Sequence, residues 1–202
     1  MPQPFEGAVL TLQGEALHTK SAAGKCKIKY MYMAVGNGTY SSSEKAKATL
    51  KSRTALKAEK NRYSFSDIMV ENRNLVKLKA LITNYDQASQ KTLISSAYYI
   101  NEIGIYAKEE GQPDSAAVLV SIAVTASSSG NGDFMPPYNG MNPTTITQNF
   151  YVTVDDEANV TINVKGAALL AEDANKITDD STKLRYKLGI DNGNLYYVQI
   201  DE

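Results

Sequence analysis

The chain has 202 residues, of which 43% are hydrophobic and 21% are charged. This length allows one large domain or two small ones with a sizeable core. The 21 basic and 22 acidic residues give a formal net charge of -1, which provides no overall field for nucleic acid or an anionic membrane. We therefore expect neither partner, and the single cysteine, Cys26, excludes an intramolecular disulfide.

The first residues lack the order of a signal peptide, and no apolar run approaches the roughly 18–20 residues of a membrane span. We therefore expect synthesis in the cytoplasm. Residues 11 to about 23 should form a short helix, because Leu12, Ala16 and Leu17 lie near one face. Gly24 follows where a left-handed helix cap is favourable.

A strand is expected over residues 26–35, ending in the turn 36–38. Alternation places five residues on its apolar face: Cys26, Ile28, Tyr30, Tyr32 and Ala34. The glycines of the turn are explained by a tight bend. The Lys-rich residues 41–53 should form a solvated surface segment with at most a helical turn.

Two further pairs of strands follow. Residues 61–70 and 75–83 flank a hairpin turn, and the second strand alternates as a half-buried strand does. Residues 145–154 and 160–164 are expected as strands around a polar turn.

The centre of the fold is expected at residues 98–107 and 118–125, two β-branched and aromatic stretches joined by a polar turn. They should pair as an antiparallel hairpin. Glu102 interrupts the apolar pattern of the first strand. Because an unpaired buried carboxylate would cost several kcal/mol or more, we expect Glu102 to be held by a basic side chain or by backbone N–H groups, rather than to serve as a catalytic acid.

The longest irregular stretch is residues 127–143, which contain Pro136, Pro137 and Tyr138. A loop of this length is uncommon in a compact domain unless it has a function or contacts a neighbour. We predict an inter-subunit contact here.

From residue 166 the chain becomes small and polar, and then two alternating stretches, 184–190 and 196–200, flank a turn. This predicts a C-terminal hairpin and a division into domains 1–165 and 166–202. The expected fold is mainly β (α+β), with antiparallel sheets and one short N-terminal helix.

The residues suited to catalysis or metal binding are few. His18 is the only histidine and is expected at the surface or its boundary, while Cys26 should act as a small buried hydrophobe. The acidic clusters 155–157 and 179–180 lack the spacing of a calcium loop. We therefore predict no catalytic residue, no cofactor and no metal, and no enzymatic activity.

Several short motifs in order resemble the N-terminal, particle-attached domain of bacteriophage tail fibre and tail-collar proteins. They are the helix start LTLQG at 10–14, the strand end AVGNG at 34–38, and the core YYINEIGIYA at 98–107. The likeness continues through the strand 118–125 and the FMPP loop at 134–137. The stretch 186–197 also resembles a C-terminal hairpin of structural proteins from phages of Gram-positive bacteria.

This resemblance implies a non-enzymatic structural component of a phage or prophage tail, made in the host bacterial cytoplasm and located in the virion. Its partners would be other tail or baseplate proteins and further copies of itself. Because the chain lacks the long shaft of family members, a baseplate or connector subunit is expected. The candidate structural or assembly residues are Glu102, Gly104, Tyr106, Pro136, Pro137, Tyr138, Tyr196 and Tyr197.

Two alternatives remain open at this stage. The Tyr-rich strands, with Tyr196 and Tyr197 as an exposed pair, could belong to a carbohydrate- or receptor-binding module. A hydrolase that uses Glu102 would need a second carboxylate nearby in space.

Overall fold

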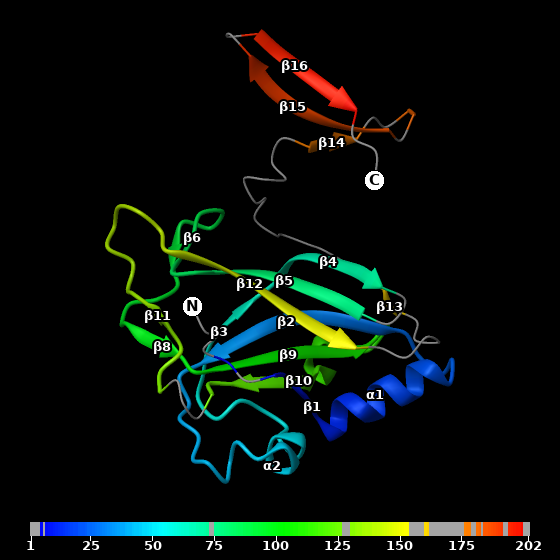
Figure 1. Ribbon diagram of the computed structural model, residues 1–202, viewed down its shortest axis with the longest axis vertical. Coiled ribbons are helices and arrows are strands. Elements are labelled where there is room, and N and C mark those ends of the chain that lie inside the picture. The colour runs from blue at the N-terminus through cyan, green and yellow to red at the C-terminus, as the bar shows by residue number, and fades with distance from the viewer. Residues whose placement is uncertain are drawn as a thin grey trace. The chain divides into compact units, whose positions relative to one another are not determined.

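The computed structural model describes residues 5, 7–72, 75–126, 130–153, 160–161, 176–178, 181–182, 184–191 and 194–199. The chain divides into two compact units, Met1–Ala167 and Ala168–Glu202 (Figure 1). The sequence predicted a domain boundary between residues 165 and 166.

The larger sheet of the first unit runs in the order β1-β10-β9-β2-β13, with β3 also paired to β2. Its strands are β1 (Val9–Leu10), β2 (Ile28–Gly36), β3 (Glu59–Tyr63), β9 (Glu102–Glu109), β10 (Val118–Val124) and β13 (Val160–Thr161). All pairs are antiparallel except β13 with β2. The predicted antiparallel pairing of β9 with β10 is therefore confirmed.

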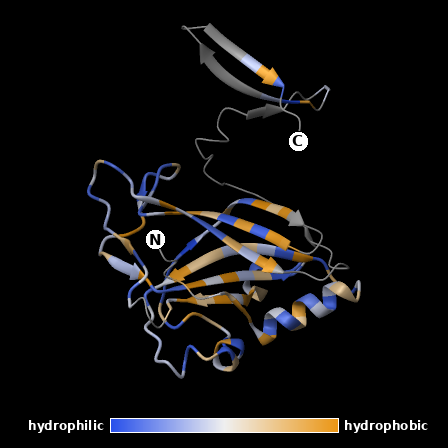
Figure 2. Ribbon diagram, viewed as in Figure 1, coloured by the Kyte–Doolittle hydropathy of each residue, from blue (hydrophilic) through white to orange (hydrophobic). Residues whose placement is uncertain are grey.

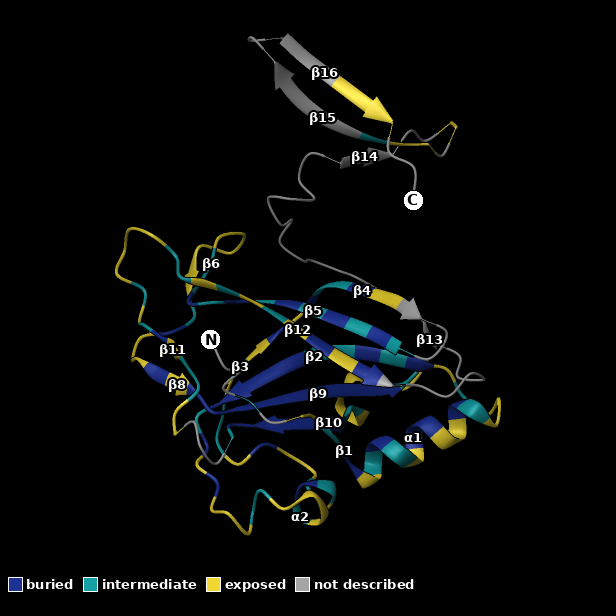
Figure 3. Ribbon diagram, in the orientation of Figure 1, coloured by how far each residue is buried: buried dark blue, intermediate teal, exposed yellow. Residues whose placement is uncertain are grey.

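A second, three-stranded antiparallel sheet has the order β12-β5-β4. Its strands are β12 (Thr145–Thr153), β5 (Leu75–Thr83) and β4 (Phe65–Asn72). Alternate residues of β5, from Val76 to Ile82, are buried, and this alternation can be followed in Figures 2 and 3. They share one hydrophobic core with Met33 of β2 and Ile105 of β9, so the two sheets pack face to face.

The central strands β9 and β10 are buried on both faces, as Figure 3 shows. One face contributes to the core between the sheets. The other contributes to a second core, in which Tyr106 and Leu119 pack with Tyr40, Leu50 and Leu56. The segment that supplies these three residues includes the short helix α2 (Lys47–Lys51). Coverage on both sides explains why residues 103–107 of β9 and all of β10 carry no charge.

Helix α1 (Leu12–Ala22) confirms the predicted helix, with Thr11 capping its start and Gly24 at φ +68° after its end. Its buried face is not the one expected: Leu12 is exposed, and the buried residues are Gly14, Leu17, His18 and Ser21. A Cβ at Gly14 would lie 2.2 Å from the Val120 carbonyl oxygen. This glycine therefore lets the helix approach β10 closely, and the predicted surface position of His18 is wrong.

Several predicted strands have different boundaries or faces. In β2 a register irregularity between Tyr30 and Tyr32 puts Tyr30 and Met33 in the inter-sheet core, and Tyr32 and Ala34 on the opposite face. The predicted common face of this strand is therefore wrong. Cys26 lies before β2, partly buried against the inter-sheet core.

The expected strand 61–70 is two strands, β3 and β4, which belong to different sheets. The expected strand 98–107 also breaks, at Asn101, into β8 (Tyr98–Ile100) and β9. The Asn101 backbone N–H donates to Gly36, and its side chain accepts from the Gly132 backbone N–H, each at 2.9 Å. These bonds to other segments end the strand.

Short pairs complete the first unit. They are β6 (Tyr85–Asp86) with β7 (Lys91–Thr92), and β8 with β11 (Asp133–Met135), while η1 (Asp114–Ala116) precedes β10. The predicted strands 145–154 and 160–164 correspond to β12 and β13, which lie in different sheets. Figure 1 shows β6, β8 and β11 at the same end of this unit.

The second unit contains the antiparallel strands β14 (Lys176–Thr178), β15 (Arg185–Asp191) and β16 (Asn194–Gln199). The predicted C-terminal hairpin, β15 with β16, is confirmed. Together the two units confirm a mainly β fold with antiparallel sheets. No helix in the described part of the chain is long and apolar enough to cross a membrane.

Candidate functional site

Glu102 lies fully buried at the start of β9 and accepts four hydrogen bonds. Its Oε1 accepts the backbone N–H groups of Gly38 at 3.1 Å and Ala58 at 2.7 Å. Its Oε2 accepts the backbone N–H of Lys57 at 2.8 Å and the Tyr40 hydroxyl. The prediction that backbone N–H groups hold this carboxylate is confirmed. We call these five residues the Glu102 anchor.

Two glycines make room for the Glu102 carboxylate. A Cβ would lie 2.4 Å from Oε1 at Gly36 and 2.6 Å at Gly38. Gly36 lies in β2 and residues 37 and 38 form no turn, so the close approach of the carboxylate, rather than the predicted tight bend, explains these glycines. Gly36 lies directly opposite Glu102 in the β2–β9 ladder, and a side chain there would occupy the space that the carboxylate fills.

Charged side chains also brace the segment that supplies the anchor's donors. Lys57 and Arg53 both contact the Glu44 carboxylate, at 2.7 Å and 3.3 Å, and both lie over the Tyr40 ring. The hydrogen bond from Lys57, with others from Ser41, lowers the pKa of Glu44 to about 2. Burial raises the pKa of Tyr40, and its bond to Glu102 acts in the same direction. These contacts hold residues 40–57 together, and the Tyr40 hydroxyl joins that segment to Glu102 of the sheet.

Gly104 and Tyr106, two predicted structural residues, lie in the second core. A Cβ at Gly104 would come within 2.9 Å of both Leu119 and Leu56. Tyr106 is buried and stacks on Tyr32 with ring centroids 4.8 Å apart, and burial raises its pKa to about 12. Both residues therefore support the packing of β9 rather than offer a contact surface.

Aromatic side chains gather on the predicted contact loop and on the strands β6 and β8 beside it. Phe134 on β11 contacts Tyr99 on β8, with ring centroids 5.3 Å apart, and these residues are 51% and 43% exposed. Four residues after Phe134, Tyr138 stacks on Tyr85 of β6 at 4.2 Å. Met141, which follows, is 79% exposed. We call these five residues the aromatic surface.

This loop is held in place by Asn84, a buried residue that the sequence did not single out. The Asn84 side chain donates to the Pro136 carbonyl at 3.2 Å and accepts the Thr144 backbone N–H at 2.8 Å. The Tyr138 backbone N–H donates to Ile94 at 3.0 Å. Pro136 is partly buried and Pro137 is exposed. Residues 136–144 are therefore fixed at both ends.

The tyrosines of the C-terminal hairpin are described only in part. Tyr197 is 70% exposed and meets the Tyr186 ring edge-on, with centroids 5.5 Å apart. The side chain of Tyr196, the acidic clusters 155–157 and 179–180, and residues 127–129 of the long loop lie outside the described residues. The predicted tyrosine pair remains a prediction.

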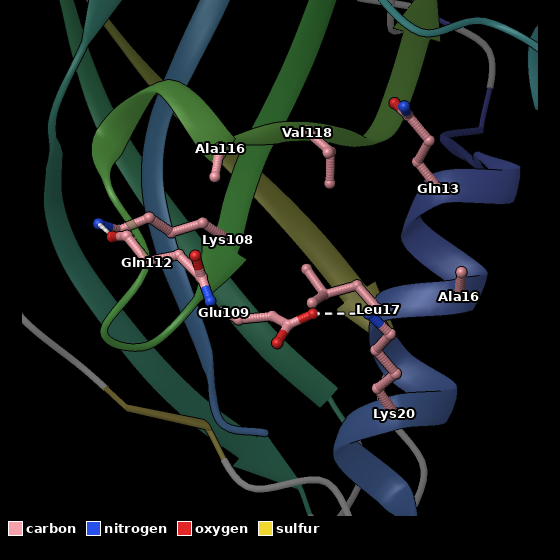
Figure 4. A pocket seen from close by; sticks show the side chains of 9 residues that line it. All are labelled: Gln13, Ala16, Leu17, Lys20, Lys108, Glu109, Gln112, Ala116 and Val118. Carbon is pink, nitrogen blue, oxygen red and sulfur yellow. Dashed lines mark hydrogen bonds and ion pairs between the residues drawn. The ribbon is translucent and has the colours of Figure 1, made fainter. Parts of the chain in front are cut away.

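A pocket of about 320 Å³ lies between α1 and the β9–β10 connection (Figure 4). Its apolar lining comes from Ala16, Leu17, Ala116 and Val118. At its rim Lys20 pairs with Glu109 at 2.8 Å, and the nearly buried Lys108 pairs with Asp114 at the same distance. Both lysines are thus neutralised by the protein's own carboxylates, and the lining includes no Ser, Thr, Cys or His.

Within the described ranges, no group of three or more His, Cys, Asp or Glu side chains could hold a metal ion. No protein-family model matches this chain, and comparisons with curated proteins and with solved structures find no match. The functional argument therefore depends on the residues themselves.

Proposed function

We propose that this chain is a non-enzymatic structural subunit of a phage or prophage tail, which binds neighbouring tail or baseplate proteins through the aromatic surface. The single observation that carries the proposal is the exposed pair Tyr99 and Phe134, held opposite each other on the paired strands β8 and β11. Exposed aromatic residues that are already held in place lose little conformational entropy on binding, and such residues dominate protein interfaces.

The Glu102 anchor supports the same proposal. The Glu102 carboxylate, which interrupts the apolar pattern of the central strand, accepts hydrogen bonds from three backbone N–H groups and one hydroxyl. Its position is thereby explained by a structural role, which joins residues 38–58 to the central strand. The motifs that resemble tail fibre and tail-collar proteins include this strand and the FMPP loop.

The test is complementation of a phage or prophage from which the gene for this chain has been deleted. We expect the wild-type chain to restore tails, and the variant Tyr99→Ser/Phe134→Ser to lower the yield of infectious particles at least about tenfold, because truncating aromatic residues at the centre of an interface weakens binding strongly. Both side chains are exposed, so the purified variant should keep the wild-type unfolding midpoint.

Met69→Ser is the matched control, because Met69 is a large apolar residue on β4 that is 42% exposed. It should complement as the wild type does. Normal tails with the Tyr99→Ser/Phe134→Ser variant would contradict the proposed role of the aromatic surface.

A carbohydrate- or receptor-binding module is the second candidate, favoured by the exposure of Tyr197 beside Tyr186. An aromatic ring with a free face can stack on a sugar. A glycan array would test it: binding that is lost in Tyr197→Ser supports the module, and the absence of any bound glycan contradicts it.

A further inference from the structure

Strand β12 is an uncharged edge of the three-stranded sheet. Its sequence, TITQNFYVT, contains no charged residue, no proline and no glycine. It pairs with β5 over all nine residues, and no described strand pairs with its other side. Such an edge is a template for another strand, and proteins that stay single usually protect it with charges, proline or bulges.

The opposite edge of the same sheet has that protection. Strand β4 carries the charged residue Asp67, and its ladder with β5 contains two register irregularities. The two edges therefore differ in kind. The β4 edge has a charge and irregularities that oppose the addition of another strand, whereas the β12 edge has no charge and a regular ladder.

The direction of the backbone groups on β12 follows from its ladder. Thr144 and Asn84 continue the register of β12 with β5, and the Asn84 N–H donates to the Thr144 carbonyl. In an antiparallel ladder the residues alternate, so the backbone groups of the odd-numbered residues 145–153 point away from β5. The Gln148 side chain donates to the Asn149 carbonyl at 2.9 Å, which fits an outward carbonyl.

We propose that two copies of this chain pair antiparallel through β12, about a two-fold axis at Asn149, and so join their three-stranded sheets into one continuous sheet. This register pairs every outward odd-numbered residue with another one, which allows up to about ten hydrogen bonds. A two-fold interface must be complementary to itself. Here Asn149 faces Asn149, and Thr147 faces Tyr151.

The even-numbered residues pair in the same register, in which Gln148 faces Phe150 and Ile146 faces Val152. On the core side, the partly buried Ile146 faces the buried Val152, so an apolar residue meets an apolar residue. No charge opposes a like charge, because β12 carries none. The pairing depends on neither the aromatic surface nor the tail assignment.

The experiment is light scattering of the purified full chain over a wide range of concentrations. The wild type should have twice the mass of one chain. Asn149→Pro removes an outward N–H and no bond to β5, so it should keep the fold and raise the dimer dissociation constant at least about tenfold. Met69→Lys, on the protected edge, should leave the dimer unchanged.

A charge exchange tests the register. Asn149→Lys and Asn149→Glu should each weaken the dimer, because like charges would lie directly opposite. An equimolar mixture of the two should restore it. Three results would overturn the pairing: the mass of one chain for the wild type, a mass insensitive to Asn149→Pro, or a mixture no more associated than its components.

Discussion

The Glu102 carboxylate occupies the space where a side chain at Gly38 would begin. Its Oε1 accepts the Gly38 backbone N–H at 3.1 Å and lies 2.6 Å from the position of a Cβ on that glycine. The two residues are 64 positions apart in the chain. The absence of a side chain at Gly38 thus leaves room for the buried carboxylate. The hydrogen bond between the two residues joins the segment 38–58 to the central sheet.

Replacing Glu102 by glutamine should destabilise the protein by about 2–4 kcal/mol. An amide presents an NH₂ donor to one of the N–H or O–H groups that now point at a carboxylate oxygen, and it removes the charge that strengthens the remaining bonds. The measurement is urea unfolding followed by circular dichroism.

Glu109→Gln is the control for this prediction, since it removes the same charge from an ion pair with Lys20 near the surface. Exposed pairs contribute at most about 1 kcal/mol. If both variants unfolded at the wild-type midpoint, the structural role of Glu102 would be wrong.

Gly36→Ala should destabilise the protein by about 1–3 kcal/mol or more, the usual cost of overpacking. The new Cβ would lie 2.4 Å from Glu102 Oε1 and 2.5 Å from the Ala58 carbonyl oxygen, and the second of these is backbone that cannot rotate away. Gly7→Ala is the control, because nothing lies within 4 Å of its Cβ and its φ is not positive. Equal thermal unfolding midpoints for Gly36→Ala and Gly7→Ala would contradict this packing.

Acid should remove the contribution that the ionised Glu44 carboxylate makes to the free energy of unfolding. Its pKa in the folded protein is about 2, against an ordinary value of 4.5, chiefly because Lys57 donates a hydrogen bond to it. The folded state therefore binds this proton less readily than the unfolded chain does. The stabilisation is complete above pH 4.5 and is lost as the pH falls through 2.

The measurement compares urea midpoints of the wild type and Glu44→Gln between pH 7 and pH 2. The difference between the two proteins should be constant down to about pH 5 and should then shrink toward zero. A difference that stays constant to pH 2 would show that the ionised carboxylate is not the stabilising group.

Asn84→Ala should destabilise the protein by about 1–3 kcal/mol, because it leaves the Pro136 carbonyl and the Thr144 N–H without their partner. Amide hydrogen exchange at Tyr138 and Thr144 should also become faster, while exchange in β9 should not. Asn131→Ala changes an exposed residue near the same loop and should leave exchange unaltered. Unchanged protection at Thr144 in Asn84→Ala would show that the loop is fixed by other contacts.

The sequence predicted those features that depend on neighbouring residues in the chain. The alternation in β5, the antiparallel pair β9–β10 and the C-terminal hairpin follow from a period of two between turn residues. The engagement of Glu102 by N–H groups was also predictable, because a buried carboxylate must have partners. Its four donors were not, since they come from a segment 44–64 positions away in the chain.

Long-range packing decided the features that the sequence missed. The irregularity after Tyr30 reverses the faces of β2, and a local pattern of alternating residues gives no sign of it. Gly14 lowers helix propensity, yet it is the residue that lets α1 lie against Val120 and bury His18. Asn84 looks like an ordinary loop residue, and only the approach of residues 136–144 gives it a role.

The proposal that this chain is a structural subunit of a phage or prophage tail is tested most directly by quantitative mass spectrometry of tail particles purified from the strain whose genome encodes the chain. If the chain is a structural subunit, it should be present in a fixed ratio to the other tail proteins and should remain after a high-salt wash. Its absence from particles that are otherwise complete, or an amount that falls with each step of purification, would contradict the proposed function.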